Sequence, residues 1–134
     1  YIKAPISSLY TALSSEKGLG EVWTKKLNVK PELGFVNEFD FDEGYITKMK
    51  IIELKEDEKI VWECISSDEE WVGTHISFEL SQKDNMTKVL LKHSNWREMT
   101  EFYQWCNYNW AMFLFSLKTY CEKEKGLPYQ ERDF

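Results

Sequence analysis

Two histidines are the side chains of this sequence best suited to proton transfer, and strand alternation separates them. His93 follows Val89 and Leu91 at every second position, so its side chain is expected to point into the interior. His75 lies between the apolar positions of its own strand and is expected to face solvent. A buried imidazole could donate a hydrogen bond to a ligand or act as a general acid or base. The alternative is a histidine that is satisfied by a backbone carbonyl at the edge of the core.

No stronger catalytic or cofactor-binding pattern accompanies these histidines. Because the only two histidines lie on opposite faces, we expect no metal site. The sequence contains no P-loop, dinucleotide fingerprint, HExxH pair or Ser-His-Asp spacing, so we expect no cofactor and no set of catalytic residues. Glu38, Asp40 and Asp42 share one face of a strand and are interpreted as solvated surface instead of a glycosidase pair.

Aromatic side chains are the second chemical feature, since they make up 16% of the sequence. Large, flat side chains suit either a thick core or the wall of a cavity for an apolar molecule. A few inward polar groups, such as Thr74 and Asn109, would orient a ligand in such a cavity, unless they only bond locally. The residues expected to line a ligand site are therefore Trp23, Phe39, Phe41, Met49, Trp62, Thr74, His93, Trp96, Asn109, Trp110, Phe113 and Leu117.

Composition and charge argue against several partner classes. The net charge of −6 argues against nucleic acid and anionic membrane surfaces, which both favour basic patches. No run approaches the roughly 18–20 apolar residues that cross a bilayer, so we expect no membrane insertion. The three cysteines show no CxxC spacing and are interpreted as reduced thiols of a cytoplasmic protein: Cys64, Cys106 and Cys121.

The element that must position these residues is a long helix, predicted over residues 99–125. The stretch contains no proline or glycine, and Gly126 and Pro128 follow it as stop signals. Its apolar residues predict two stripes at helical spacing, the first Trp110, Phe113, Leu117 and Tyr120 or Cys121, and the second Phe102, Trp105, Asn109, Met112 and Ser116. A helix with apolar residues on every side must be enclosed or must leave one face for a partner.

The rest of the chain is expected to enclose this helix. Pro5 and a turn-spaced apolar face predict a short helix over 6–13, and a cap at Ser14 or Ser15 predicts a second one over 15–23. A brief strand is expected over 26–30. From Gly34 the apolar period changes to two, which predicts five or six antiparallel strands joined by short loops. A parity switch at Ile52 predicts a β-bulge.

These elements predict an α+β fold, in which a twisted antiparallel sheet covers the long C-terminal helix and two short helices follow the first strand. We expect one domain over residues 1–134, and residues 1–4 look like the end of a strand whose beginning is missing. One of the later strands is expected to start at Val72 and to place Val72 and Thr74 on the core side. A twisted sheet around one helix tends to leave a tunnel where their curvatures differ.

The order of several motifs resembles the START-like (SRPBCC) superfamily. The first part of the chain is similar to the opening of START-like domains in its residues Ile2-Lys3-Ala4-Pro5, Leu9-Tyr10-x-Ala12-Leu13 and Trp23. The later part is similar to one branch, the homologues of the C-terminal domain of the activator of heat-shock protein 90 ATPase, in its residues Phe78-Glu79-Leu80, Thr87-x-Val89-x-Leu91-x-His93 and Asn109-Trp110. The resemblance covers essentially the whole chain. It implies a helix-grip fold with a cavity for an apolar molecule between sheet and final helix.

Three functions are compatible with this sequence, and we favour the first. The first is a non-catalytic module that binds a small hydrophobic or amphipathic molecule. The second is an enzyme similar to the polyketide cyclases or dehydratases of the superfamily, with His93 as acid or base. The third is a protein-interaction module, as a homodimer or with a chaperone partner, whose surface would come from the apolar stretch 105–115 and the aromatic tail 129–134.

Overall fold

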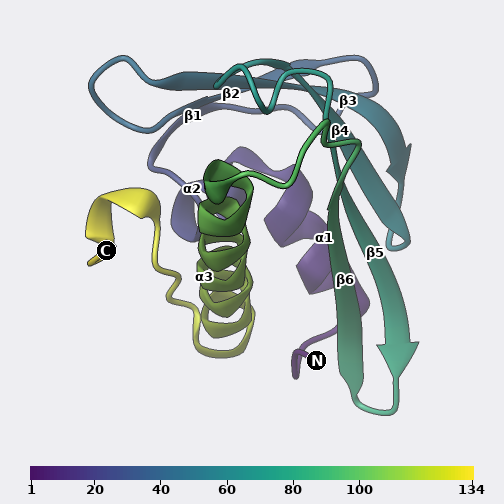
Figure 1. The fold of residues 1–134 in the computed structure, drawn as a ribbon. Helices are drawn as coiled ribbons and strands as arrows, with labels where there is room; N and C mark the ends of the chain where they lie inside the picture. The colour runs from purple at the N-terminus through teal and green to yellow at the C-terminus, as the bar shows by residue number, and fades with distance from the viewer.

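A six-stranded antiparallel sheet curls around a long C-terminal helix in the computed structural model, which describes residues 1–134 (Figure 1). The strands lie in the sheet in chain order: β1 (Lys26–Asn28), β2 (Val36–Asp40), β3 (Ile46–Lys55), β4 (Lys59–Ser66), β5 (His75–Lys83) and β6 (Met86–Ser94). The helices are α1 (Ile6–Ser14), α2 (Glu16–Val22), α3 (Glu101–Lys123) and the short 3-10 helix η1 (Tyr129–Glu131). This architecture confirms the predicted α+β helix-grip fold.

The long helix α3 is two residues shorter at each end than the predicted 99–125. Thr100 caps its first turn, because the Thr100 hydroxyl accepts a hydrogen bond from the Tyr103 amide at 3.2 Å. Glu124, with φ of 61°, takes the left-handed position that ends the helix, although Gly126 was the predicted stop signal. Gly126 serves a different purpose, since a Cβ there would overlap the carbonyl oxygen of Glu21. The glycine therefore lets the chain leave α3 in close contact with α2.

Most of the other predicted elements are confirmed with small shifts. Ser15 is the cap of α2, and its hydroxyl accepts a hydrogen bond from the Gly18 amide at 3.0 Å. The predicted bulge in β3 is present as a register shift between Ile51 and Glu53. The predicted first strand is reduced to one antiparallel pair, in which Ile2 bridges Thr87 of β6.

The strand predicted to start at Val72 begins three residues later, at His75, and this part of the prediction is wrong. Val72 lies in a turn instead, with 38% of its surface exposed. The turn is held by the Thr74 hydroxyl, which donates to the carbonyl of Trp71 at 2.6 Å. A local side-chain bond of this kind competes with the sheet ladder, and the alternation of apolar residues does not reveal it.

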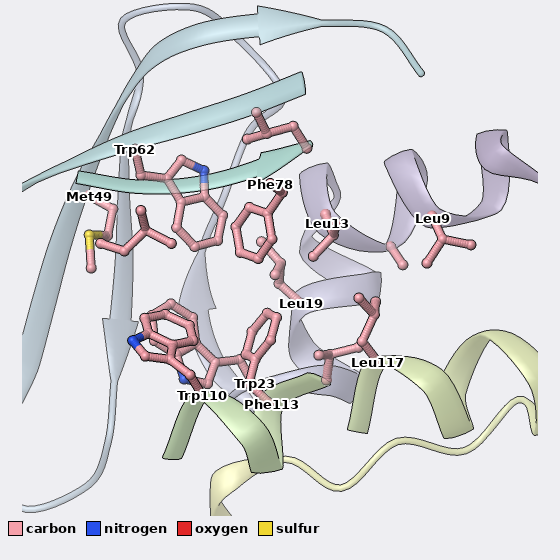
Figure 2. Close-up of a cluster of buried hydrophobic side chains, with 14 of the residues drawn as sticks. Leu9, Leu13, Leu19, Trp23, Met49, Trp62, Phe78, Trp110, Phe113 and Leu117 are labelled. Atoms are coloured by element: carbon pink, nitrogen blue, oxygen red, sulfur yellow. The ribbon is translucent and has the colours of Figure 1, made fainter. Parts of the chain in front are cut away.

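The core fills the space between the concave face of the sheet and α3 (Figure 2). Figure 2 shows leucines of α1 and α2 pointing toward Leu117 of α3, and aromatic side chains of α3 pointing toward Trp62 and Phe78 of the sheet. The first predicted stripe of α3 is confirmed over Trp110, Phe113 and Leu117, which are all buried, whereas Tyr120 and Cys121 at its end are half-buried. Most of the predicted tunnel is therefore packed with side chains.

Gly18 and Gly20 offer a matched test of how tightly α1 and α2 pack. A Cβ on Gly18 would overlap backbone atoms of Ala12, whereas a Cβ on Gly20 would meet only the Leu27 side chain at 3.5 Å. Gly18→Ala is expected to lower the free energy of unfolding by about 1–3 kcal/mol, as overpacking does. Gly20→Ala is expected to raise it by about 0.5–1 kcal/mol, because alanine favours the helix. Urea denaturation measures both, and equal stabilities for the two variants would contradict this packing.

Candidate ligand pocket

One part of the space between sheet and helix is open. A pocket of about 540 Å³ lies where the N-terminal half of α3 faces the β2–β3 turn, which is within the size range of small-molecule sites. Half of its fourteen lining residues are aromatic, and none has an aliphatic side chain: Trp23, Phe41, Asp42, Glu43, Tyr45, Thr47, Asp68, Trp71, Phe102, Trp105, Cys106, Asn109, Tyr129 and Arg132. The pocket therefore combines apolar aromatic walls with charged groups.

Helix α3 forms one wall of the pocket through one of its faces. Phe102, Trp105 and Asn109 recur three and four residues apart, which places them on the same side of the helix. They are the N-terminal half of the second predicted stripe. The first stripe packs into the core, so the two stripes have different roles.

The C-terminal segment forms a second wall by folding back beside α3 (Figure 1). The Tyr129 amide donates to the carbonyl of Trp23 at 2.6 Å, and the Gln130 side chain accepts from the Lys25 amide at 3.0 Å. Arg132 is anchored by its Nε, which donates to the Leu127 carbonyl at 2.9 Å. These bonds fix Tyr129 and Arg132 against the pocket.

The indole of Trp23 separates the pocket from the core. On the sheet side, the centre of its ring lies 4.5 Å from that of Phe39 and 5.8 Å from that of Trp62. On the α3 side, it lies 5.5 Å from the ring centres of Trp110 and Phe113. Only 6% of Trp23 is exposed, and it also lines the pocket. One aromatic side chain thus completes the core and provides the floor of the pocket.

Three carboxylates lie in the pocket lining. Asp42 pairs with Lys26 at 2.8 Å, and hydrogen bonds from Lys26 and then Gln130 hold the pKa of Asp42 below its ordinary value. Glu43 and Asp68 make no ion pair within 4.0 Å. Asp42 was interpreted from the sequence as solvated surface, but the β2–β3 turn carries it to the edge of the pocket. Asp42 and Glu43 both take left-handed backbone conformations there, with φ of 71° and 53°.

His93 takes part in a chain of hydrogen bonds behind the pocket. The Trp110 indole donates to His93 Nδ1 at 2.9 Å, and Thr74 donates its only hydroxyl proton to the Trp71 carbonyl. The Thr74 oxygen must therefore accept from His93 Nε2, 2.7 Å away, which fixes the tautomer with its proton on Nε2. Burial lowers the pKa of His93 to about 4, so the ring is neutral at pH 7.

His93 is thus inward-facing, as predicted from its parity, but both ring nitrogens are already engaged. Its partners are side chains of α3 and of the turn before β5, not the backbone carbonyl of the alternative interpretation. His93 is also absent from the residues that line the pocket. His75 lies on the outer face of the sheet, 3.4 Å from the Glu63 carboxylate.

The structure brings only part of the predicted ligand site to the pocket. Of the twelve residues, three line it: Trp23, Phe41 and Asn109. Eight are enclosed in the core or in the His93 hydrogen-bond chain: Phe39, Met49, Trp62, Thr74, His93, Trp110, Phe113 and Leu117. Trp96 packs outside this group against the rings of His93 and Tyr103, with no hydrogen-bond partner for its indole nitrogen.

Sequence reasoning missed the pocket residues that come from turns and from the tail, such as Glu43, Asp68 and Arg132. Only the second stripe of α3 carried a usable signal, because Phe102 and Trp105 belong to it together with Asn109. Cys106 lies beside them, where its sulfur accepts a hydrogen bond from the Trp71 indole at 3.1 Å. Burial raises the pKa of the Cys106 thiol to about 11, so the thiol stays protonated and is a poor nucleophile at pH 7.

Neither a metal centre nor a membrane-spanning helix is found. No three His, Cys, Asp or Glu side chains are arranged to hold a metal ion. None of the helices combines the length and the apolar character needed to cross a bilayer. What the geometry offers is an aromatic pocket with an acidic edge.

A curled antiparallel sheet that grips a long C-terminal helix, with a pocket between them, defines a START-like domain. The chain belongs to the family of activator of Hsp90 ATPase homolog 1-like proteins, whose sequence pattern matches residues 3–122. The Aha1 dimer from Colwellia psychrerythraea is 37% identical, with 93% of each chain covered and a TM-score of 0.86. No curated protein matches the chain in sequence.

More distant structures share the fold alone. A protein from Mesorhizobium loti is 20% identical, with 89% of this chain and 90% of that chain covered and a TM-score of 0.78. A protein from Bacillus halodurans is 18% identical, with 91% and 92% covered and a TM-score of 0.73. These similarities agree with the family assignment and carry no information about a ligand.

The half-buried, neutral His93 predicts a specific dependence of stability on pH. Its pKa of about 4 in the folded state lies below the ordinary value of 6.5, so the unfolded chain binds the proton first as the pH falls. Stability is therefore present above pH 6.5 and is lost as the pH falls toward 4, by about 3 kcal/mol in total. His93→Gln can keep both hydrogen bonds and should flatten this loss between pH 6.5 and 5. An NMR titration of His93 with a midpoint near 6.5 would contradict the buried, neutral ring.

Proposed function

We propose that this protein binds a small hydrophobic or amphipathic molecule in the pocket between α3 and the β2–β3 turn, without catalysing a reaction on it. The observation that carries the proposal is the open volume of about 540 Å³, bordered by seven aromatic side chains. Aromatic rings bury a large apolar area. The Asn109 amide nitrogen donates to the Trp105 carbonyl at 2.9 Å, which leaves the Asn109 side-chain oxygen to orient a ligand. Trp23 gives the pocket a rigid floor, which lowers the entropic cost of binding.

The positions of the reactive side chains favour binding over catalysis. One ring nitrogen of His93 is hydrogen-bonded to Trp110 and the other to Thr74. Cys106, at the pocket wall, is held in its thiol form by burial, which raises its pKa to about 11. An acid or base must reach the proton that it transfers, and His93 lies behind the lining instead of in it. The cyclase-like function of the sequence analysis therefore gains no support from this geometry.

A larger groove elsewhere is a weaker candidate for the same ligand. It has a volume of about 640 Å³ and lies between α1, α2 and the C-terminal half of α3. Its lining is mainly polar, with serines, Thr11 and the charged groups of Lys17, Glu21 and Glu124. Polar, solvated walls of this kind offer little apolar area to bury.

A homodimer is the second candidate function, and exposed aromatic residues favour it. Trp105, Tyr108 and Phe115 recur along one face of α3 and are 48%, 48% and 60% exposed. These three residues form a row of exposed aromatic side chains, here called the α3 stripe, which differs from the two stripes predicted from the sequence. Phe134 extends it, because the centre of its ring lies 5.9 Å from that of Trp105. The 37% identical relative from Colwellia psychrerythraea is a dimer. Exposed apolar patches of this kind mark interaction sites. The chaperone partner stays a prediction from the family resemblance.

Ligand binding can be tested by filling the pocket from α3. Asn109→Trp places a large ring among the lining residues, whereas Asn107→Trp places the same ring on an exposed part of α3 outside the lining. N-phenyl-1-naphthylamine, a neutral fluorescent probe, is expected to bind the natural protein and Asn107→Trp equally. Asn109→Trp should weaken binding about tenfold or more, or by at least about 1.4 kcal/mol. Equal affinity for all three proteins would refute this pocket as the binding site.

The α3 stripe can be tested by adding a charge to it. Phe115→Glu should abolish a dimer held by the stripe, because a carboxylate would be desolvated within the interface. Leu90→Glu, on the outer face of β6, places a charge at a position that is 39% exposed and away from the stripe. Light scattering is expected to detect a dimer for the natural protein and Leu90→Glu, and a monomer for Phe115→Glu. A monomer at high concentration for the natural protein would rule out the homodimer.

A further inference from the structure

The aromatic character of the pocket is not a simple consequence of composition. The neighbouring core is rich in aliphatic side chains, including Leu9, Leu13, Leu19, Ile60 and Leu117. The pocket, by contrast, has seven aromatic rings and no aliphatic residue. Both kinds of wall accept a hydrocarbon, but only aromatic rings present the negative face of a π system. A positive charge is attracted to such a face when it lies within about 6 Å of the ring centre.

The charged residues around the pocket also favour a positively charged ligand. Three acidic residues line the pocket, Asp42, Glu43 and Asp68, but only one basic residue, Arg132. Lys26 already neutralises Asp42 at 2.8 Å, which leaves Glu43 and Asp68 without a cationic partner. The Arg132 guanidinium is held by the carbonyls of Leu127 and Val22, at 2.9 and 3.1 Å. The Arg132 charge is therefore partly compensated by two backbone carbonyls. Asp68 is compensated by one backbone amide, and the Glu43 carboxylate accepts no hydrogen bond.

The charge of Asp68 also acts on a neighbouring thiol. After burial, the charges of Asp68 and Glu70 raise the pKa of Cys106 further, against the lowering effect of the Trp71 hydrogen bond. Asp68 keeps one oxygen occupied, since it accepts a hydrogen bond from the Glu70 amide at 2.9 Å. Its second oxygen makes no ion pair. The whole chain carries a net charge of −6, which favours the approach of a cation over that of an anion.

We propose that the ligand of this pocket is an organic cation, an amine or quaternary ammonium group on an apolar body, which the aromatic walls and the carboxylates of Glu43 and Asp68 recognise together. The proposal rests on the proposed binding function and specifies its ligand class. The apolar body replaces water against the Trp23 floor, and the cationic group lies between the rings and the two acids. Aromatic rings and carboxylates reinforce one another here, because each stabilises positive charge and neither loses a partner when the cation enters.

The test uses three probes that share one naphthylmethyl body and differ in charge. The first carries a trimethylammonium group, the second its neutral tert-butyl isostere, and the third a sulfonate. Calorimetric titration of the intact protein is expected to give a cation affinity about tenfold above that of the neutral isostere, with the sulfonate weakest. The preference for the cation should shrink as salt is added, because screening weakens the attraction.

The outcomes separate this inference from the function on which it rests. Neutral or anionic probes that bind as tightly as the cation would overturn the charge preference while leaving the pocket function intact. A sulfonate that binds most tightly would assign the ligand to Arg132 instead. If none of the three probes bound, the proposed binding function itself would fall, and the charge preference with it.

Two isosteric variants locate the charge preference. Asp68→Asn keeps an oxygen for the Glu70 amide, and Glu43→Gln keeps the size of the side chain, so each removes only a charge. Each is expected to weaken binding of the cation about fivefold and to leave the neutral isostere unchanged. Glu56→Gln, in the β3–β4 turn at the far end of β3, is the control and should change neither. A cation affinity that is unchanged in both pocket variants would overturn the proposal, since the unchanged neutral probe reports an intact pocket.

Discussion

The packing of Trp23 is the constraint on which the rest of this structure depends. Its ring contacts aromatic residues of β2, β4 and α3 at centroid distances between 4.5 and 5.8 Å. Trp23, from the segment that joins α2 to β1, therefore links sheet and long helix in addition to their direct contacts, such as that between the rings of Phe78 and Phe113 at 5.7 Å. On one side of this ring the space is filled by the core, and on the other side it is open. The Trp23 indole therefore separates the packed core from the open pocket.

A second, polar constraint holds α3 in place beside that boundary. Trp110, His93, Thr74 and the Trp71 carbonyl form one chain of hydrogen bonds, in which every donor has an acceptor. A satisfied buried network is rigid, whereas the same groups without partners would each cost about 1–3 kcal/mol. The histidine that looks most catalytic in the sequence thus serves to position α3. Its neutrality at pH 7 follows from burial, which lowers its pKa to about 4.

The sequence predicted the fold well, because the spacing of apolar residues along the chain determines which segments form helices and which form strands. The change from helical to alternating spacing at Gly34, the parity switch at Ile52 and the apolar stripe of Trp110, Phe113 and Leu117 all reappear as predicted elements. The pocket was predicted poorly, because strand parity says which residues face inward but not which of them remain uncovered. Phe39 and Trp62 face inward and are sealed, whereas Tyr129 and Arg132 reach the pocket only through the tail that folds back. Such contacts between distant segments leave no trace in local spacing.

In the proposed binding mode, the space beside Trp23 admits a ligand and the space behind it does not. The most direct measurement is an isotope-filtered nuclear Overhauser experiment on the protein with bound N-phenyl-1-naphthylamine. Binding in this pocket predicts contacts from the probe to Trp71, Trp105 and Tyr129, and none to Trp62. Contacts confined to the polar groove, at Thr11 and Tyr120, or no contacts at all, would contradict it.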